Sequence, residues 1–236
     1  MAVAASFTGF SRDSVQFLVE LALHNERSWF QPRKADYERL LKEPMEALCR
    51  VLAGRFEAEG LPLRSDPSHS PFRIYRDVRF SADKSPYKTH VSASFPWAGD
   101  GGGVGAYFHL QPGEMFAGGG MWHPEPSQLA AWRQTVAANY EEVEATLKSP
   151  TFVATFGSVS GERLKRVPTG FAADQPGAEL LKLKDVTFGR PLSDDEVFSS
   201  HLPDVLVETF AEAIPLLDLL ARLSPGEISA GWLRGG

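Results

Sequence analysis

The sequence contains one cysteine, Cys49, among its 236 residues. A single cysteine excludes an internal disulfide and a cysteine-based zinc site, and its place between Leu48 and Val51 indicates a small core side chain rather than a nucleophile. The sequence also lacks an apolar run of the ~20 residues that a membrane-spanning helix requires. Its first residues have no basic region of the kind that opens a secretory signal. We therefore expect a soluble, cytoplasmic protein with no membrane partner.

Basic residues are in the minority, with 24 Lys and Arg against 30 Asp and Glu, for a formal net charge of -6. A dedicated DNA-binding protein usually has a basic domain or stripe, so nucleic acid is not favoured as a partner. The sequence contains no phosphate-binding glycine loop, dinucleotide fingerprint, nucleophile elbow or HExxH motif, and we predict no cofactor. No internal repeat or domain linker interrupts it, so residues 1–236 are expected to form a single domain.

Apolar residues recur at helical spacing at both ends of the chain. Ser11 is placed to cap a first helix, while Pro32 and Pro44 suit the first turns of a second and a third. A long helix is expected after Pro126. Further on, residues 193–196 read as a capping box, and a final helix carries Pro215.

Between residue 72 and about residue 122 the apolar period changes from helical to alternating. This pattern predicts four strands, over residues 73–80, 87–95, 104–111 and 114–122. In each of the first three strands, alternate side chains form two sets, of which one is more apolar and the other more polar. Such a division is typical of an antiparallel sheet with one buried face. The predicted fold is α+β, an antiparallel β-meander of about four or more strands with helices from both chain ends packed on one face.

The polar sets of these strands are expected to form one contiguous patch, because neighbouring strands lie ~5 Å apart. A shift of one residue in the register would turn the patch to the other face. Arg76 alternates toward the apolar side, where a buried structural ion pair is expected. The predicted patch contains Arg73, Tyr75, Asp77, Arg79, Lys88, His90, Tyr107, His109 and Gln111.

The loop of residues 81–86 and the glycine run of residues 118–120 lie beside this patch. Asp83 is expected to form the turn of the loop through its side chain, and Lys84 to lean over the polar face. In the glycine run, Gly119 favours close approach by a ligand or another backbone. A bulge or turn before the long helix explains the glycines equally well.

The segment RDVRFSADKSPYKTH, with HNERSWF before it and YFHLQPGEMFAGGGMWHPEP after it, resembles a conserved hypothetical family, domain of unknown function 2461. The similarity extends over nearly the whole chain and includes FGRPLSDDEVF near its end. The resemblance implies a single α+β domain and no established activity. Its motif positions are Arg76, Asp77, Arg79, Phe80, Ser81, Asp83, Lys84, Pro86, Tyr87 and Lys88.

The leading functional hypothesis is a pocket for an anionic small molecule that carries phosphate or carboxylate. Arginine and lysine hold such groups by charge-assisted hydrogen bonds. If the pocket is catalytic, Asp77 or His109 is the expected acid or base, with Tyr75 and Tyr107 orienting the substrate. The predicted ligand-binding residues are Arg73, Tyr75, Arg79, Lys84, Lys88, Tyr107 and Gly119.

Three alternatives stay open. Asp77, His90 and His109 form a metal site if three strands bring them together, in the two-histidine, one-carboxylate pattern of non-haem iron. A basic sheet face with exposed aromatic rings, here Tyr75, Tyr107 and Trp97, is typical of single-stranded nucleic-acid binding. The third alternative is a non-catalytic network of ion pairs, which perturbs titration in the same way as a functional site.

Overall fold

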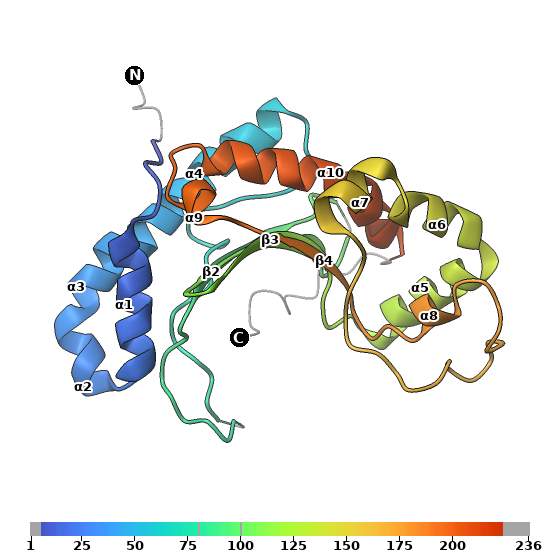
Figure 1. Ribbon diagram of the computed structural model, residues 1–236, viewed down its shortest axis with the longest axis horizontal. Helices are drawn as coiled ribbons and strands as arrows, with labels where there is room; N and C mark the ends of the chain where they lie inside the picture. The colour runs from blue at the N-terminus through green and yellow to red at the C-terminus, as the bar shows by residue number, and fades with distance from the viewer. Residues whose placement is uncertain (1–5, 80, 100, 224–236) are drawn as a thin grey trace.

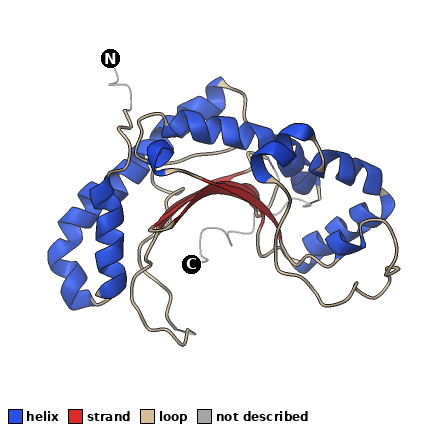
Figure 2. Cartoon of the chain, in the orientation of Figure 1, coloured by secondary structure: helices blue, strands red, loops and turns tan. Residues whose placement is uncertain are grey.

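The computed structural model describes residues 6–79, 81–99 and 101–223 (Figure 1). At its centre is a four-stranded antiparallel sheet in the order β1-β2-β3-β4. The sheet curves, and helices cover its convex side (Figure 2). Its strands are β1 (Val91–Pro96), β2 (Val104–Gln111), β3 (Glu114–Met121) and β4 (Val186–Pro191).

Two long helices form the layer on the convex side, as the alternating pattern predicts. Helix α4 contacts β1, and α10 contacts β2 and β3. Phe95 of β1 packs against Phe56 of α4 and Phe210 of α10, with ring centroids 5.6 Å apart in both pairs. On β2, Ala106 and Phe108 are fully buried on the same side. The predicted α+β meander with helices on one face is therefore confirmed.

Helices make up most of the rest of the chain, and their predicted starts are largely confirmed. Ser11 caps α1 in a capping box with Ser14, and Ser193 caps α9 in the same way with Glu196. Pro215 lies inside α10. The helices are α1 (Arg12–Leu23), α2 (Arg27–Phe30), η1 (Gln31–Arg33), α3 (Lys34–Tyr37), η2 (Glu38–Lys42), α4 (Glu43–Ala58), α5 (Pro126–Ala138), α6 (Tyr140–Leu147), α7 (Pro150–Phe156), α8 (Ala178–Leu181), α9 (Asp194–Val197) and α10 (Leu202–Arg222).

Two helix boundaries differ from the prediction. The second and third predicted helices are one run from α2 to α4, in which the short π-helix η2 precedes Pro44. The helix after Pro126 is divided in two, because Asn139 leaves helical geometry between α5 and α6. Within the described ranges, no helix is both long and apolar enough to cross a membrane.

The predicted strand over residues 73–80 is wrong, since its described residues lie outside the sheet. They form an arm (residues 73–79 and 81–89) that returns on itself and extends away from the sheet (Figure 1). Two backbone hydrogen bonds join its halves, from Arg76 N to the Pro86 oxygen and from Lys88 N to the Ile74 oxygen. Pro86 has no N–H to extend this ladder, and the arm is held by side-chain bonds instead.

The fourth strand of the sheet is one that the sequence did not predict. β4 follows α8 and pairs with β3, from Phe116 opposite Pro191 to Met121 opposite Val186. β4 is therefore one edge strand of the sheet, and β1 is the other. The meander thus consists of three consecutive strands and a fourth that returns after the helices α5 to α8.

Candidate functional site

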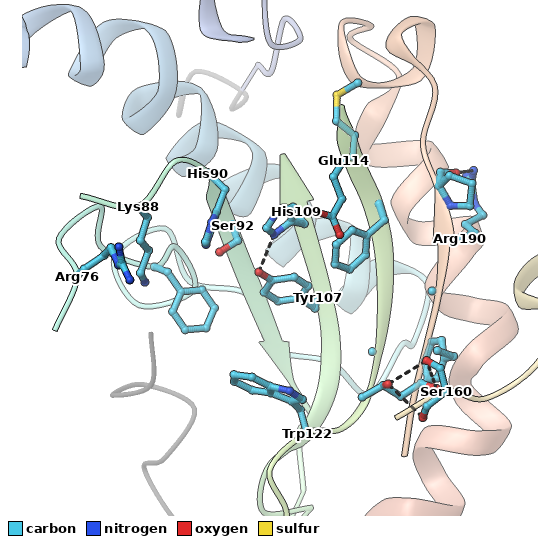
Figure 3. Close-up of a pocket in the computed structure, with 18 residues that line it drawn as sticks. Arg76, Lys88, His90, Ser92, Tyr107, His109, Glu114, Trp122, Ser160 and Arg190 are labelled. Carbon is cyan, nitrogen blue, oxygen red and sulfur yellow. Dashed lines mark hydrogen bonds between the residues drawn. The ribbon is translucent and has the colours of Figure 1, made fainter. Parts of the chain in front are cut away.

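A cavity of about 760 Å³ lies over the sheet face opposite to α4 and α10 (Figure 3). Its volume falls within the range of small-molecule sites. All four strands contribute to its wall, together with the base of the arm. The lining residues are Phe72, Arg76, Lys88, His90, Ser92, Tyr107, His109, Glu114, Met115, Phe116, Gly119, Trp122, Ser160, Thr187, Phe188, Gly189, Arg190 and Pro191.

Strand alternation places the central polar side chains of this cavity. On β2, Tyr107 and His109 alternate with the buried core residues and therefore face the opposite way. Ser92 of β1 lies directly opposite His109 in the register, and Phe116 of β3 lies opposite it on the other side. The predicted polar face is thus present on β1 and β2.

Hydrogen bonds connect three side chains along β2. The Tyr107 hydroxyl lies 3.0 Å from His109 Nδ1, and His109 Nε2 lies 3.3 Å from Gln111 Oε1. Because an amide oxygen only accepts, Nε2 donates to Gln111, and in the neutral ring Nδ1 accepts from the Tyr107 hydroxyl. Burial lowers the pKa of His109, which favours the neutral ring, although Gln111 and Glu114 oppose the shift.

A second histidine packs against the first. The rings of His90 and His109 are 4.6 Å apart, and Phe116 stacks on the other side of His109 at 4.9 Å. Burial, followed by the charges of His109, Lys88 and Arg76, lowers the pKa of His90 from 6.5 to about 4. Both histidines therefore favour the neutral state at pH 7, in which they donate and accept hydrogen bonds without adding charge.

Lys88 brings a positive charge to the same wall. The residue is 8% exposed, and its Nζ lies 5.2 Å from the centre of the Phe72 ring. Among the described residues, no group pairs with Nζ by a hydrogen bond or an ion pair. Burial, assisted by the charge of Arg73, lowers the pKa of Lys88. An ammonium that is buried without an acceptor is unfavourable, and an anion in the cavity would supply the missing partner.

Two arginines line the cavity, and both are already paired. Arg76 forms an ion pair with Asp83 across the arm and leaves 29% of its side chain exposed. The expected structural ion pair of Arg76 is therefore present, but it lies within the arm, and Arg76 is only partly buried. Arg190 of β4 donates to Thr209 and Glu196, 3.0 Å away in each case.

Several lining residues were missed from the sequence. Arg190, Gly189 and Thr187 were missed because β4 itself was not predicted. Glu114 is the first residue of β3, and Trp122 follows the last one. At the two ends of a strand, the alternation of apolar and polar residues does not show which face a side chain belongs to. The capping-box signal at residues 193–196 places a helix after β4 but does not identify the strand before it.

The arm carries five of the predicted site residues outside the cavity wall. Asp77 and Arg79 pair with each other, with 2.6 Å between Oδ2 and Nη2, and this bond lowers the pKa of Asp77 to about 2. Lys84 Nζ donates to the Val78 oxygen at 2.9 Å. Tyr75 is 44% exposed, and its ring lies 5.5 Å from that of Tyr87.

Arg73 is the fifth predicted residue outside the lining set, although its charge acts on Lys88. Of the predicted site residues, the structure thus brings four together in the cavity wall, namely Lys88, Tyr107, His109 and Gly119. The others do not reach the cavity because the segment that carries them is an arm and not a strand.

Backbone of the neighbouring strands lies close to the glycine run of β3. A Cβ on Gly118 would lie 2.1 Å from the Phe188 oxygen of β4, and a Cβ on Gly119 would lie 2.4 Å from the Gly105 oxygen of β2. Real Cβ atoms do not approach backbone so closely. A close approach was expected at Gly119, and the group that approaches is the backbone of β2.

The proposed metal triad does not assemble. His90 and His109 lie side by side, whereas Asp77 pairs with Arg79 in the arm. In residues 6–79, 81–99 and 101–223, no three His, Cys, Asp or Glu side chains are placed to hold a metal ion. The convergence of Asp77, His90 and His109 is therefore wrong.

The three aromatic residues proposed as a nucleic-acid stacking surface lie in different environments. Tyr107 lines the cavity, Trp97 is partly buried against the hydrophobic core, and Tyr75 is exposed on the arm. They do not form one continuous face of the sheet. Successive bases of a single strand would need such a row of rings.

Comparison with known proteins adds one finding. No curated protein and no solved structure matches the chain. A family model described as conserved hypothetical protein, DUF2461, matches residues 13–219, which include the arm and all four strands. The chain therefore belongs to this family of conserved hypothetical proteins, as the resemblance of its arm sequence indicated.

Proposed function

We propose that the cavity binds a small organic anion whose phosphate or carboxylate group pairs with Lys88. The observation that carries the proposal is the buried Lys88 ammonium, which has no acceptor within the described part of the chain. A ligand anion completes this pair and receives further support from the charge of Arg76 at the cavity wall. Charge-assisted hydrogen bonds of this kind contribute about 1.5–3 kcal/mol each.

The rest of the wall indicates what is attached to the anionic group. Phe72, Phe116, Phe188 and Met115 present apolar surface, and Trp122 adds a half-exposed indole. Phe72 contacts both the Lys88 ammonium and the Tyr107 ring, whose centroid is 6.2 Å from its own. A planar apolar body next to the anionic group therefore fits this wall, as in an aryl phosphate or an aromatic carboxylate.

Isothermal titration calorimetry with phenyl phosphate and benzoate tests the proposal, with benzyl alcohol as the neutral probe. We expect both anions to bind and the alcohol to bind at least about tenfold more weakly. Lys88→Met keeps the length of the side chain and removes its charge, and is expected to lower the affinity for the anions by about 10- to 100-fold.

Lys84→Met is the matched control, because Lys84 belongs to the same arm but bonds to a backbone oxygen away from the cavity. Its affinity for phenyl phosphate is expected to equal that of the wild type. Equal binding by wild type and Lys88→Met, or equal binding of the anions and the alcohol, would contradict the proposal.

A further inference from the structure

The hydrogen-bond chain along β2 has a direction. Gln111 Oε1 accepts from His109 Nε2 at 3.3 Å, which leaves Nδ1 as an acceptor for the Tyr107 hydroxyl at 3.0 Å. The phenol proton of Tyr107 is thus already committed to His109. Ser92 also forms a hydrogen bond with Tyr107, and burial raises the Tyr107 pKa, which keeps the phenol protonated. A phenol oxygen has two lone pairs, so one remains for a proton from a ligand in the cavity that Tyr107 lines. This geometry suits a base more than an acid.

We propose that Tyr107 and His109 form a proton relay that deprotonates a hydroxyl group of the anion bound in the cavity. The O–H bond of the ligand breaks, and its proton bonds to the Tyr107 oxygen. At the same time the original Tyr107 O–H bond breaks, and that proton bonds to His109 Nδ1. The products are a ligand oxyanion and an imidazolium, with no oxidation or reduction. The inference rests on the proposed function, because the relay acts on the ligand of that same cavity.

The charges around the two ends suit these products. A ligand oxyanion forms in a cavity whose wall carries the Lys88 ammonium and the Arg76 guanidinium. The imidazolium keeps its Nε2 hydrogen bond to Gln111 and lies near the Glu114 carboxylate, and both groups raise the pKa of His109 against the effect of burial. In this scheme Tyr107 is the catalytic residue and Gln111 is a positioning residue.

The neighbouring histidine does not compete for the proton. The ring of His90 lies 4.6 Å from that of His109. Burial and the surrounding positive charges lower the pKa of His90 to about 4, so it stays neutral when His109 becomes charged. Its packing, together with Phe116 at 4.9 Å on the other side, fixes the plane of the His109 ring.

A chromogenic probe, 4-hydroxy-3-nitrobenzoate, tests the relay, because it joins a carboxylate to a phenol that absorbs at longer wavelength when ionised. We expect the wild type, at a pH below the pKa of the free phenol, to bind the probe in its ionised form. The relay keeps the proton, so calorimetry in buffers of different ionisation enthalpy should detect almost no release of protons to the buffer. On binding, ¹⁵N NMR should show His109 becoming an imidazolium.

Tyr107→Phe is the decisive variant, and Tyr140→Phe is its control, since Tyr140 bonds to Glu144 on a distant helix. We expect Tyr107→Phe to bind the probe within about threefold of the wild-type affinity, because the Lys88 contact remains. The bound phenol should then stay protonated, with His109 neutral. An equally ionised probe in Tyr107→Phe, or release of its proton to the buffer by the wild type, would overturn the relay.

A failure of the proposed function has a different outcome. If the wild type does not bind the probe, the anion-binding proposal is wrong, and the relay loses its ligand with it. The free protein gives an independent reading by ¹⁵N NMR. The relay requires a neutral His109 with its proton on Nε2, and a proton on Nδ1 would refute it without any ligand.

Discussion

Replacing Lys88 by methionine should stabilise the ligand-free protein while it weakens anion binding. The Lys88 side chain is 8% exposed, and none of the described residues accepts a hydrogen bond from its Nζ. A buried charged donor without an acceptor costs about 1–3 kcal/mol, of which a cation–π contact such as that with Phe72 offsets about 0.5–1 kcal/mol. Methionine fills a similar volume and needs no acceptor. We therefore expect Lys88→Met to raise the free energy of unfolding by about 1–2 kcal/mol.

Urea unfolding at pH 7 measures this difference directly, and thermal unfolding should show an increase in Tm of about 3–6 °C. The difference should depend on pH. Since the pKa of Lys88 is lower in the folded than in the unfolded protein, the folded state binds fewer protons, and wild-type stability rises as pH increases from the folded pKa toward the unfolded one. The advantage of Lys88→Met should therefore shrink at alkaline pH.

Lys84→Met controls for the loss of one positive charge from the arm, and its stability should stay within about 0.5 kcal/mol of the wild type. A Lys88→Met protein that is less stable than the wild type by 1 kcal/mol or more would refute the reasoning. Such a result would mean that the ammonium group has a partner in the free protein. Lys88 would then not lower the stability of the free protein in return for its affinity for an anion.

Three further predictions follow from the same structure. Gly119→Ala should lower the free energy of unfolding by about 2–4 kcal/mol in urea unfolding, because its Cβ would lie 2.4 Å from a β2 carbonyl oxygen; Gly54→Ala, in a helix with open space around it, should instead be neutral or stabilising by up to about 1 kcal/mol. The pKa of His90 is lower in the folded than in the unfolded protein, so the stability of the wild type should fall as pH decreases from 6.5 toward about 4. Over this window the free energy of unfolding should fall by about 2 kcal/mol more in the wild type than in His90→Gln. Equal losses in the two proteins would contradict this prediction. Asp83→Asn breaks the ion pair with Arg76 and should speed amide hydrogen exchange in the arm, while global stability changes by less than about 1 kcal/mol; unchanged exchange would show that the pair does not order the arm.

Strand periodicity could be predicted from the sequence wherever a strand has one buried face. In β2, apolar and polar side chains alternate through the whole strand, and Tyr107 and His109 were correctly assigned to the face opposite Phe108. β4 escaped prediction because it carries Gly189 and Pro191 and lies far along the chain from its partner β3. The pairing of strands that are distant in sequence leaves no local signal.

In the arm the prediction failed in the opposite way, because its sequence alternates as in a strand but residues 73–79 do not belong to the sheet. Residues 73–79 alternate as a strand does, yet their side chains pair within the arm, as in Asp77 with Arg79 and Arg76 with Asp83. Alternation is expected for any extended segment, whether or not a neighbouring strand completes its hydrogen bonds. Lys88 was identified from its alternation in the predicted strand over residues 87–95. It reaches the cavity because it lies at the base of the arm, three residues before β1 begins.

The central claim is that the Lys88 ammonium holds an anion in the cavity, and NMR titration of ¹³C-labelled lysine side chains tests it most directly. In the free protein we expect the Lys88 pKa to lie below the ordinary value of a lysine. Saturation with phenyl phosphate should raise the Lys88 pKa, because a bound anion favours the charged form, while the ¹³C signal of the exposed Lys84 should not respond to the ligand. A Lys88 pKa that is ordinary in the free protein and does not move with phenyl phosphate would contradict the account.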